Sequence, residues 1–170
     1  IRMNRPKIFA HGSYIGNTGY NHHTRDFFRI LSNLADIKVR NFTVGSTWDG
    51  YSTTPHDKEP YINDIDKKLL YQQILWNNDG TMGDFAIYPD KKKEFTPDVN
   101  VVLCETDHHI FYQDYVGPKI AYNVWESTLQ PEKFFEKLKE YDELWVPSKW
   151  QKDCSINQGY DPQKIKVVPE

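Results

Sequence analysis

Residues 97–104 read Pro-Asp-Val-Asn-Val-Val-Leu-Cys, and this stretch decides the fold class. Pro97 and Asp98 end the preceding segment, and residues 99–104 then form a nearly continuous apolar run. Such a run is typical of a strand that is buried on both faces of a parallel sheet. Helices are expected to alternate with strands on either side of it, because that is the economical way to build such a sheet.

On the C-terminal side of this stretch, the pattern alternates between strand and helix to the end of the chain. The predicted strands are 119–124, 143–146 and 165–168. Pro131 begins a helix after the first of these strands, since proline suits the first position of a helix. Ser148 is a plausible N-cap for a second helix, which ends at Gly159.

On the N-terminal side, the predicted strands are 7–10, 37–44 and 84–88. The helix after the first strand is expected to bury a broad apolar stripe, which consists of Phe27, Phe28, Ile30, Leu31 and Leu34. Residues 65–76 are predicted to be a helix, and residues 45–64 a long loop. The sequence therefore predicts an α/β, Rossmann-like doubly wound fold, a mainly parallel sheet with helices on both faces.

The composition favours one globular domain over residues 1–170. The sequence is 38% hydrophobic and has 11 Tyr, 9 Phe and 5 Trp, unlike disordered chains. A formal net charge of −3 gives no general attraction for nucleic acid or an anionic membrane. No apolar stretch approaches 18 residues, so no transmembrane segment is expected. Two isolated cysteines, Cys104 and Cys154, predict neither disulfides nor zinc, and a reducing, cytoplasmic location fits best.

The loop before the first predicted helix, residues 12–21, carries three glycines, Gly12, Gly16 and Gly19. Glycine lets backbone amides approach an anion, and a helix N-terminus adds a partial positive charge. The loop matches neither the G-x-G-x-x-G pattern nor a P-loop. A phosphate site and an ordinary structural turn are both open interpretations.

Two histidine pairs occur, His22-His23 and His108-His109. Adjacent histidines point in different directions, so a metal ion would require both pairs, and no metal site is expected. His108 and His109 follow the buried strand 99–104 at its carboxyl end, where ligands bind in α/β sheets. A role in a site and ordinary hydrogen bonding within a loop are both open for these two residues.

Trp125, Glu126 and Ser127 follow the predicted strand 119–124 at its carboxyl end. A carboxylate and hydroxyls at that edge could bind sugar hydroxyl groups, and Trp125 offers a flat apolar face. The alternative is a helix-capping cluster with Trp125 in the core.

Three segments together resemble the N-terminal domain of GT-B glycosyltransferases of family 4, the retaining "glycosyl transferases group 1" type. The segments are IGNTGYNHHTRDFFRIL at 15–31, IAYNVWESTLQP at 120–131 and ELWVPSKWQKDCSINQGYDPQKIKVVPE at 143–170. The third is the most specific, because a strand ending in Val-Pro-Ser, a helix, Pro-x-Lys-Ile and Val-Val-Pro follow one another as in the family. The resemblance covers nearly the whole chain.

The resemblance implies transfer of a sugar, with retention, from a nucleotide-sugar donor to a hydroxyl of a glycan or lipid-linked acceptor. It implies no metal and no other cofactor. This domain would mainly hold the acceptor, while a C-terminal domain outside residues 1–170 would hold most of the donor. Residues 1–170 alone are therefore expected to be inactive.

The resemblance also implies roles for particular residues. The donor phosphates would lie against Gly16, Gly19, Tyr20 and Asn21, although many family members have adjacent glycines in this loop. His108 or His109 would lie near the reacting sugar, and Glu126 would face the acceptor, with Trp125 and Ser127 beside it.

Two further interpretations of the whole chain remain open. One is a free-standing flavodoxin-like module that binds a nucleotide or sugar without catalysis, and the other is a scaffold for another transferase. Half of an enzyme should expose apolar side chains where its second domain docks, whereas a complete binding module should not.

Overall fold

The computed structural model describes residues 5–44, 61–76, 82–87, 95–105 and 117–169. Its internal contacts divide the chain into two compact units, Ile1–Asp98 and Val99–Glu170. These are called the N-terminal unit and the C-terminal unit, and each is described by itself.

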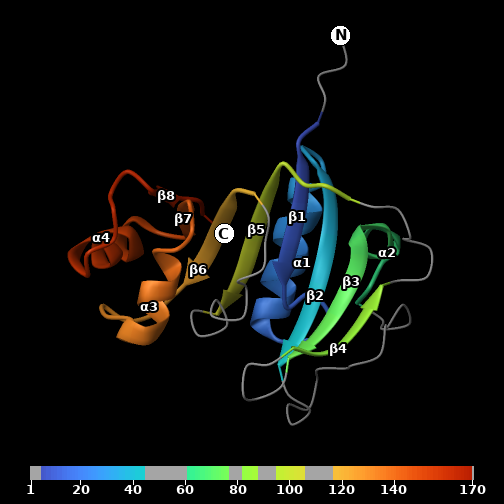
Figure 1. Ribbon diagram of the computed structural model, residues 1–170, viewed down its shortest axis with the longest axis horizontal. Helices are drawn as coiled ribbons and strands as arrows, with labels where there is room; N and C mark the ends of the chain where they lie inside the picture. The colour runs from blue at the N-terminus through green and yellow to red at the C-terminus, as the bar shows by residue number, and fades with distance from the viewer. Residues whose placement is uncertain (1–4, 45–60, 77–81, 88–94, 106–116, 170) are drawn as a thin grey trace. The chain divides into compact units, whose positions relative to one another are not determined.

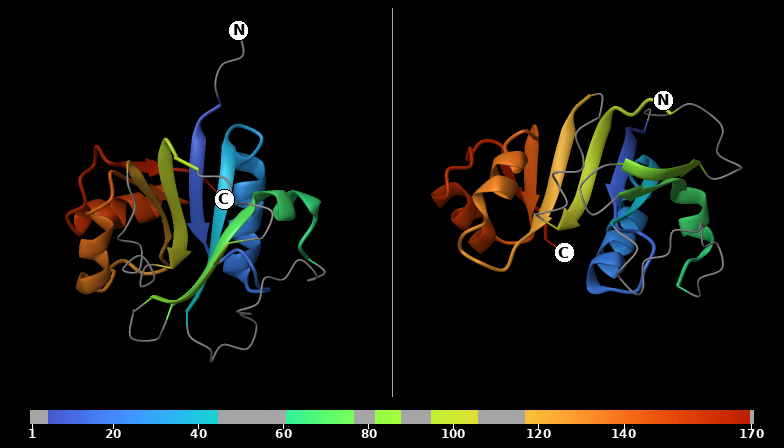
Figure 2. Two further views of the ribbon diagram at one scale, coloured as in Figure 1. Left: turned by 45° about the vertical axis from the view of Figure 1, so that its right-hand side comes forward. Right: turned by 60° about the horizontal axis from the view of Figure 1, so that its bottom comes forward.

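The N-terminal unit contains four described strands and two described helices (Figure 1). They are β1 (Lys7–Gly12), α1 (Gly19–Leu31), β2 (Asp36–Val44), α2 (Asp64–Leu69), β3 (Leu70–Trp76) and β4 (Met82–Ile87). The strand order is β4-β3-β2-β1, in which β1, β2 and β3 are parallel and β4 is antiparallel to β3. Helix α1 lies along one face of β1 and β2 (Figures 1 and 2).

The C-terminal unit repeats the alternation of strand and helix (Figure 1). Its elements are β5 (Val99–Glu105), β6 (Lys119–Val124), α3 (Glu132–Leu138), β7 (Glu143–Val146), α4 (Lys149–Asn157) and β8 (Ile165–Val167). The four strands are parallel and run in the order β5-β6-β7-β8. Val101, Val102 and Leu103 are fully buried, as expected for a strand covered on both faces.

These elements confirm the predicted α/β class with a mainly parallel, Rossmann-like sheet. The predicted start of α4 is also confirmed, because Ser148 is its N-cap and accepts a hydrogen bond from the Gln151 amide. Gly159, just after the helix, has φ of +101°, a conformation in which glycine commonly ends helices.

The prediction of one helix over 65–76 is wrong. Helix α2 ends at Leu69, and Leu70 has ψ of 125°, outside the helical range. Residues 70–76 instead form β3, which pairs with β2 on one side and β4 on the other. The spacing of apolar residues fits a helix locally, but pairing with two neighbouring strands stabilises the extended form and overrides it.

The predicted apolar stripe along α1 is confirmed only in part, because Phe28 is buried and Phe27 and Leu31 are half-buried, whereas its other two residues are exposed. Ile30 is 67% exposed, and Leu34, which lies beyond the end of the helix, is 69% exposed. The buried residues of α1 are Asn21, Thr24, Arg25 and Phe28. Three of these four are polar, and two of them, Asn21 and Arg25, donate hydrogen bonds to the backbone of the preceding loop.

Most of the predicted loop 45–64 lies outside the described residues, although Asp64 already belongs to α2. None of the helices that the structure describes combines the length and apolar character needed to cross a membrane.

Candidate functional site

Gly16 lies in the loop between β1 and α1, at the carboxyl end of β1. Its φ is +140°, a backbone conformation that side chains rarely allow. A Cβ atom on Gly16 would also collide with the side-chain amide of Asn21. The fold itself therefore requires glycine at this position.

Asn21, in the first turn of α1, is completely buried and holds this loop from inside. Its Nδ2 donates to the carbonyl oxygen and the hydroxyl of Ser13, each at 2.9 Å. Its Oδ1 accepts from the amide of Thr18 at 2.9 Å and from the Thr18 hydroxyl at 2.7 Å. Thr18 in turn caps the helix, so the loop and the start of α1 form one hydrogen-bonded structure.

Asn41 of β2 and Arg25 of α1 form hydrogen bonds with the backbone of the same loop. The Asn41 Oδ1 accepts from the amides of Tyr14 at 2.7 Å and Ile15 at 2.8 Å. Arg25 Nη1 donates to the carbonyl oxygens of Tyr14 at 2.8 Å and Gly16 at 2.7 Å. Burial lowers the pKa of Arg25 from its usual value. The guanidinium nevertheless donates to these two carbonyl oxygens, so the buried side chain stabilises the loop.

An ion pair between half-buried Arg29 and buried Asp66 anchors Tyr14, the aromatic residue of the loop. The Tyr14 hydroxyl donates to Asp66 Oδ1 at 2.5 Å, and Arg29 donates to both carboxylate oxygens of Asp66, at 2.8 and 2.5 Å. Burial opposes the charged carboxylate, but hydrogen bonds from Arg29 and Tyr14 outweigh it and lower the pKa of Asp66. Burial, reinforced by Asp66, raises the pKa of Tyr14, which keeps its hydroxyl protonated.

Gly19, the first residue of α1, differs from Gly16 in its exposure, its backbone conformation and the space around it. It is exposed, its φ is not positive, and a Cβ atom there would meet nothing within 4 Å. No hydrogen-bond acceptor for its amide is found in the part of the chain that the structure describes. The fold does not require glycine here, and the missing side chain leaves the start of a 13-residue helix open.

Of the residues predicted to bind donor phosphates, the structure brings all four together at the junction of this loop and α1. Gly16 and Asn21 are buried and hold the loop, whereas Gly19 is exposed and Tyr20 is half-buried. The surface offered to a ligand is therefore that of Gly19 and its neighbours, and a phosphate role for any of the four stays a prediction.

The predicted acceptor residues lie in the C-terminal unit, in the loop between β6 and α3. Glu126 and Ser127 are exposed, and Trp125 is half-buried. The indole nitrogen of Trp125 donates to the carbonyl oxygen of Leu129 at 2.9 Å. The N-cap of α3 is Pro131, which makes no side-chain capping bond. The loop thus presents polar side chains to solvent and does not cap the helix.

Two amide side chains, Gln151 of α4 and Gln158 at its C-cap, fix this loop to the helix, and a third contact joins the two ends of the loop. Gln158 donates to the carbonyl oxygen of Gln130 at 2.7 Å and accepts from its amide at 2.8 Å. Gln151 donates to the Asn123 carbonyl oxygen at 2.8 Å and accepts from the Trp125 amide at 3.2 Å. Asn123 donates to the side chain of Gln130 at 3.2 Å. Both ends of the loop are therefore held in place.

Of the two histidine pairs, His22-His23 lies among the residues that the structure describes. His108 and His109 lie outside the described residues. His22 is exposed on α1, where its ring contacts the side chains of Asn17 at 2.9 Å and Arg25 at 3.2 Å. Among the residues that the structure describes, no three His, Cys, Asp or Glu side chains gather as a metal ion would require.

Sequence reasoning missed Arg25, Asn41 and Asp66, which support the loop at the start of α1. Asn41 does carry a signal, because it is a polar residue near the carboxyl end of a strand. Asp66 carries another, since Asn63 and Asp66 form a capping box. The groups to which these residues form hydrogen bonds are brought near them by the fold, and no local sequence pattern indicates which groups they are.

The sequence matches no protein-family model, and no curated protein or solved structure shows significant similarity to it.

Proposed function

We propose that this chain is the acceptor-side domain of a retaining glycosyltransferase that uses a nucleotide-sugar donor. The observation that carries the proposal is the open start of α1 at Gly19, on a loop that buried side chains hold rigidly. The donor diphosphate would lie against this helix end.

Three properties of this helix end suit a diphosphate. The first amides of a helix have no partner within the helix, and the helix dipole favours an anion there. Gly19 carries no side chain to obstruct the approach. The hydrogen bonds of Asn21, Arg25 and Asn41 fix the loop before a ligand arrives, so binding would require little ordering of the backbone.

The loop between β6 and α3 supports an acceptor role. Glu126 and Ser127 are exposed and can bind hydroxyl groups, while the amide contacts of Gln151 and Gln158 fix the backbone around them. The acceptor in this proposal is a glycan or lipid-linked sugar. No metal or other cofactor takes part, because helix dipoles and basic residues of the donor-binding domain would stabilise the leaving diphosphate.

Exposed apolar side chains in the C-terminal unit favour the interpretation that this domain packs against a second domain. In the C-terminal unit, Leu129 is 67%, Trp150 49% and Val167 40% exposed. All three follow or end a parallel strand on its carboxyl side, after β6, after β7 and at the end of β8. Apolar exposure at the edge where ligands bind suits the docking of a donor-binding domain better than a free-standing module.

The proposal is tested with protein made from the complete coding sequence. UDP- and GDP-sugars are supplied with glycolipid and glycan extracts of the source cells, and release of nucleoside diphosphate is measured. We expect release, lowered at least tenfold by Gly19→Val, since the valine side chain would cover the helix end. The control is Asn33→Val, an exposed position beyond the other end of α1. Binding of the nucleotide sugars without release would favour the free-standing binding module and contradict catalysis.

A further inference from the structure

His22, in the first turn of α1, links a buried cation to the exposed loop before the helix. Its ring nitrogens have two different partners, because Nδ1 lies 3.2 Å from Arg25 Nη2 and Nε2 lies 2.9 Å from Asn17 Oδ1. Arg25 is 1% exposed, whereas His22 and Asn17 are both exposed. The three side chains therefore form a chain of hydrogen bonds that leads from the interior to the surface.

The chemistry of arginine fixes the direction of this chain. A guanidinium group has only donors, so Arg25 donates and His22 Nδ1 accepts. A ring nitrogen that accepts carries no proton, so the imidazole is neutral and its proton is on Nε2. Nε2 then donates to the side-chain oxygen of Asn17. With this oxygen engaged, Asn17 can offer a ligand the two hydrogens of its Nδ2.

The positive charge of Arg25 is not neutralised by a carboxylate. Asp26 and Asp66 both pair with Arg29, and no carboxylate in the described part of the chain forms an ion pair with Arg25. A hydrogen bond from a cation is stronger than one between neutral groups, and hydrogen bonds in a chain polarise one another. The buried charge therefore polarises His22, and through it the amide group of Asn17.

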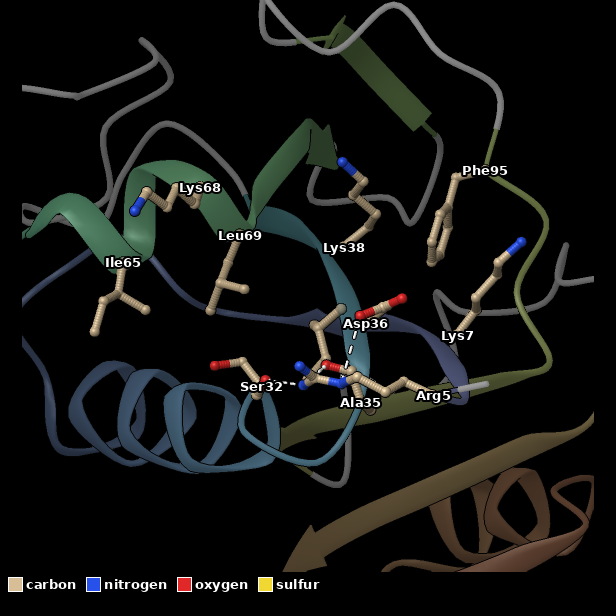
Figure 3. A pocket seen from close by; sticks show the side chains of 11 residues that line it. Arg5, Lys7, Ser32, Ala35, Asp36, Lys38, Ile65, Lys68, Leu69 and Phe95 are labelled. Atoms are coloured by element: carbon tan, nitrogen blue, oxygen red, sulfur yellow. Dashed lines mark hydrogen bonds and ion pairs between the residues drawn. The ribbon is translucent and has the colours of Figure 1, made fainter. Parts of the chain in front are cut away.

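The arginine at the opposite end of α1 is arranged differently (Figure 3). Arg5 lies 3.5 Å from Asp36 and donates to the carbonyl oxygens of Ser32 and Ala35. A carboxylate thus compensates its charge, and its donors hold backbone groups after the last turn of the helix. Arg5 stabilises the end of α1, whereas Arg25 polarises exposed side chains at the start.

From this arrangement we propose that His22 is a positioning residue, which in its neutral form with the proton on Nε2 orients the Asn17 amide to donate to the donor diphosphate. The inference rests on the proposed function, because it adds a contact at the same helix end. Asn17 directly precedes Thr18, the N-cap of α1, and is exposed. Its polarised amide hydrogens supplement the backbone amides of the helix start.

The first measurement is the protonation of the His22 ring in the isotope-labelled chain at neutral pH. Long-range proton–nitrogen couplings of the imidazole report which ring nitrogen carries the proton, and His22→Ala identifies the signals of His22. We expect a proton on Nε2 and none on Nδ1. A proton on Nδ1 would overturn the proposal, since Nδ1 could then accept nothing from Arg25. This measurement needs no ligand, so its result does not depend on the proposed function.

The second measurement is a titration with pyrophosphate, which compares wild type with Asn17→Ala, His22→Ala and the control Asn33→Ala. All three positions are exposed, so the variants should fold. Asn17→Ala and His22→Ala should each weaken binding roughly three- to tenfold. Asn33→Ala removes the same amide group beyond the other end of α1 and should leave binding within about twofold of wild type.

The double variant Asn17→Ala/His22→Ala separates positioning from direct contact. Because His22 acts through Asn17, the double variant should bind pyrophosphate no more weakly than Asn17→Ala alone. Losses that multiply would mean that His22 contacts the ligand itself, and they would overturn the positioning role. Binding that survives unchanged in both single variants would overturn this inference alone. No binding to wild type would contradict the proposed function as well, whatever the protonation of His22.

Discussion

The side-chain nitrogen of Asn21 lies 2.9 Å from the carbonyl oxygen of Ser13, so the first turn of α1 holds the loop that leads into it. The same amide group accepts two hydrogen bonds from Thr18. Asn21, for which the resemblance predicts a contact with the donor phosphates, thus shapes the loop before α1 from a buried position.

Replacing Asn21 by aspartate should destabilise the domain by about 2–4 kcal/mol. The change keeps the shape and the acceptor for Thr18 but removes the donor to Ser13 and buries a charge. Urea unfolding measures the loss. Asn17→Asp, an exposed position in the same loop, is the control and should change the free energy of unfolding by less than about 0.5 kcal/mol. Equal losses in the two variants would contradict the role of Asn21.

Alanine at the two glycines of the loop should have opposite consequences. Gly16→Ala should cost about 2 kcal/mol or more in stability, because φ is +140° and the new Cβ atom would meet Asn21. Gly19→Ala should be neutral or slightly stabilising, since its φ is not positive and the space is open. Thermal unfolding of both variants checks this difference, and a large loss at Gly19 would show that the fold does need glycine there.

Removing the charge of Asp66 should change how stability depends on pH. The pKa of Asp66 is lowered in the folded protein, so its contribution is present above the unfolded pKa of about 3.9 and is lost as pH falls below it. Asp66→Asn should cost about 3 kcal/mol at neutral pH, because Arg29 loses its carboxylate partner.

Unfolding measured from pH 7 to pH 2 compares Asp66→Asn with wild type, and the difference in stability should shrink toward the acid end. Asp64→Asn, at a side chain that is 93% exposed, is the control and should follow the wild-type curve. A difference that stays constant across this range would contradict the ion pair with Arg29.

Replacing Gln158 by alanine should loosen the loop that carries Glu126. Gln158 holds both the amide and the carbonyl oxygen of Gln130, so the variant leaves two backbone groups without these partners and should lose about 1–3 kcal/mol. Hydrogen exchange at the Gln130 amide should become faster. Gln163→Ala, an exposed position after α4, should leave that exchange rate unchanged.

The sequence was most informative where one signal decides a local structure. The apolar run at 99–104 predicts a buried parallel strand, and Ser148 predicts the start of α4, because burial on both faces and capping each leave a direct mark in the sequence. Both predictions are confirmed. The prediction for 65–76 is wrong, because the decision between helix and strand lies in the partners β2 and β4, which a local pattern does not contain.

The candidate site could be predicted only in outline. Three glycines before a helix indicate the loop, but the distinction between Gly16 and Gly19 depends on a dihedral angle and on the position of Asn21. The polar face of α1 was missed for a related reason. The hydrogen bonds of Arg25 reach backbone carbonyl oxygens, and backbone groups carry no residue-type signal.

The central claim is that a diphosphate binds at the start of α1, and its most direct test is a titration of the isotope-labelled chain with UDP, GDP and pyrophosphate. We predict weak, saturable shifts of the Gly19 and Tyr20 amide resonances with all three, none with uridine or guanosine, and loss of binding in Gly19→Val but not in Asn33→Val. Shifts that leave these two amides unchanged, or binding that survives Gly19→Val, would contradict the account.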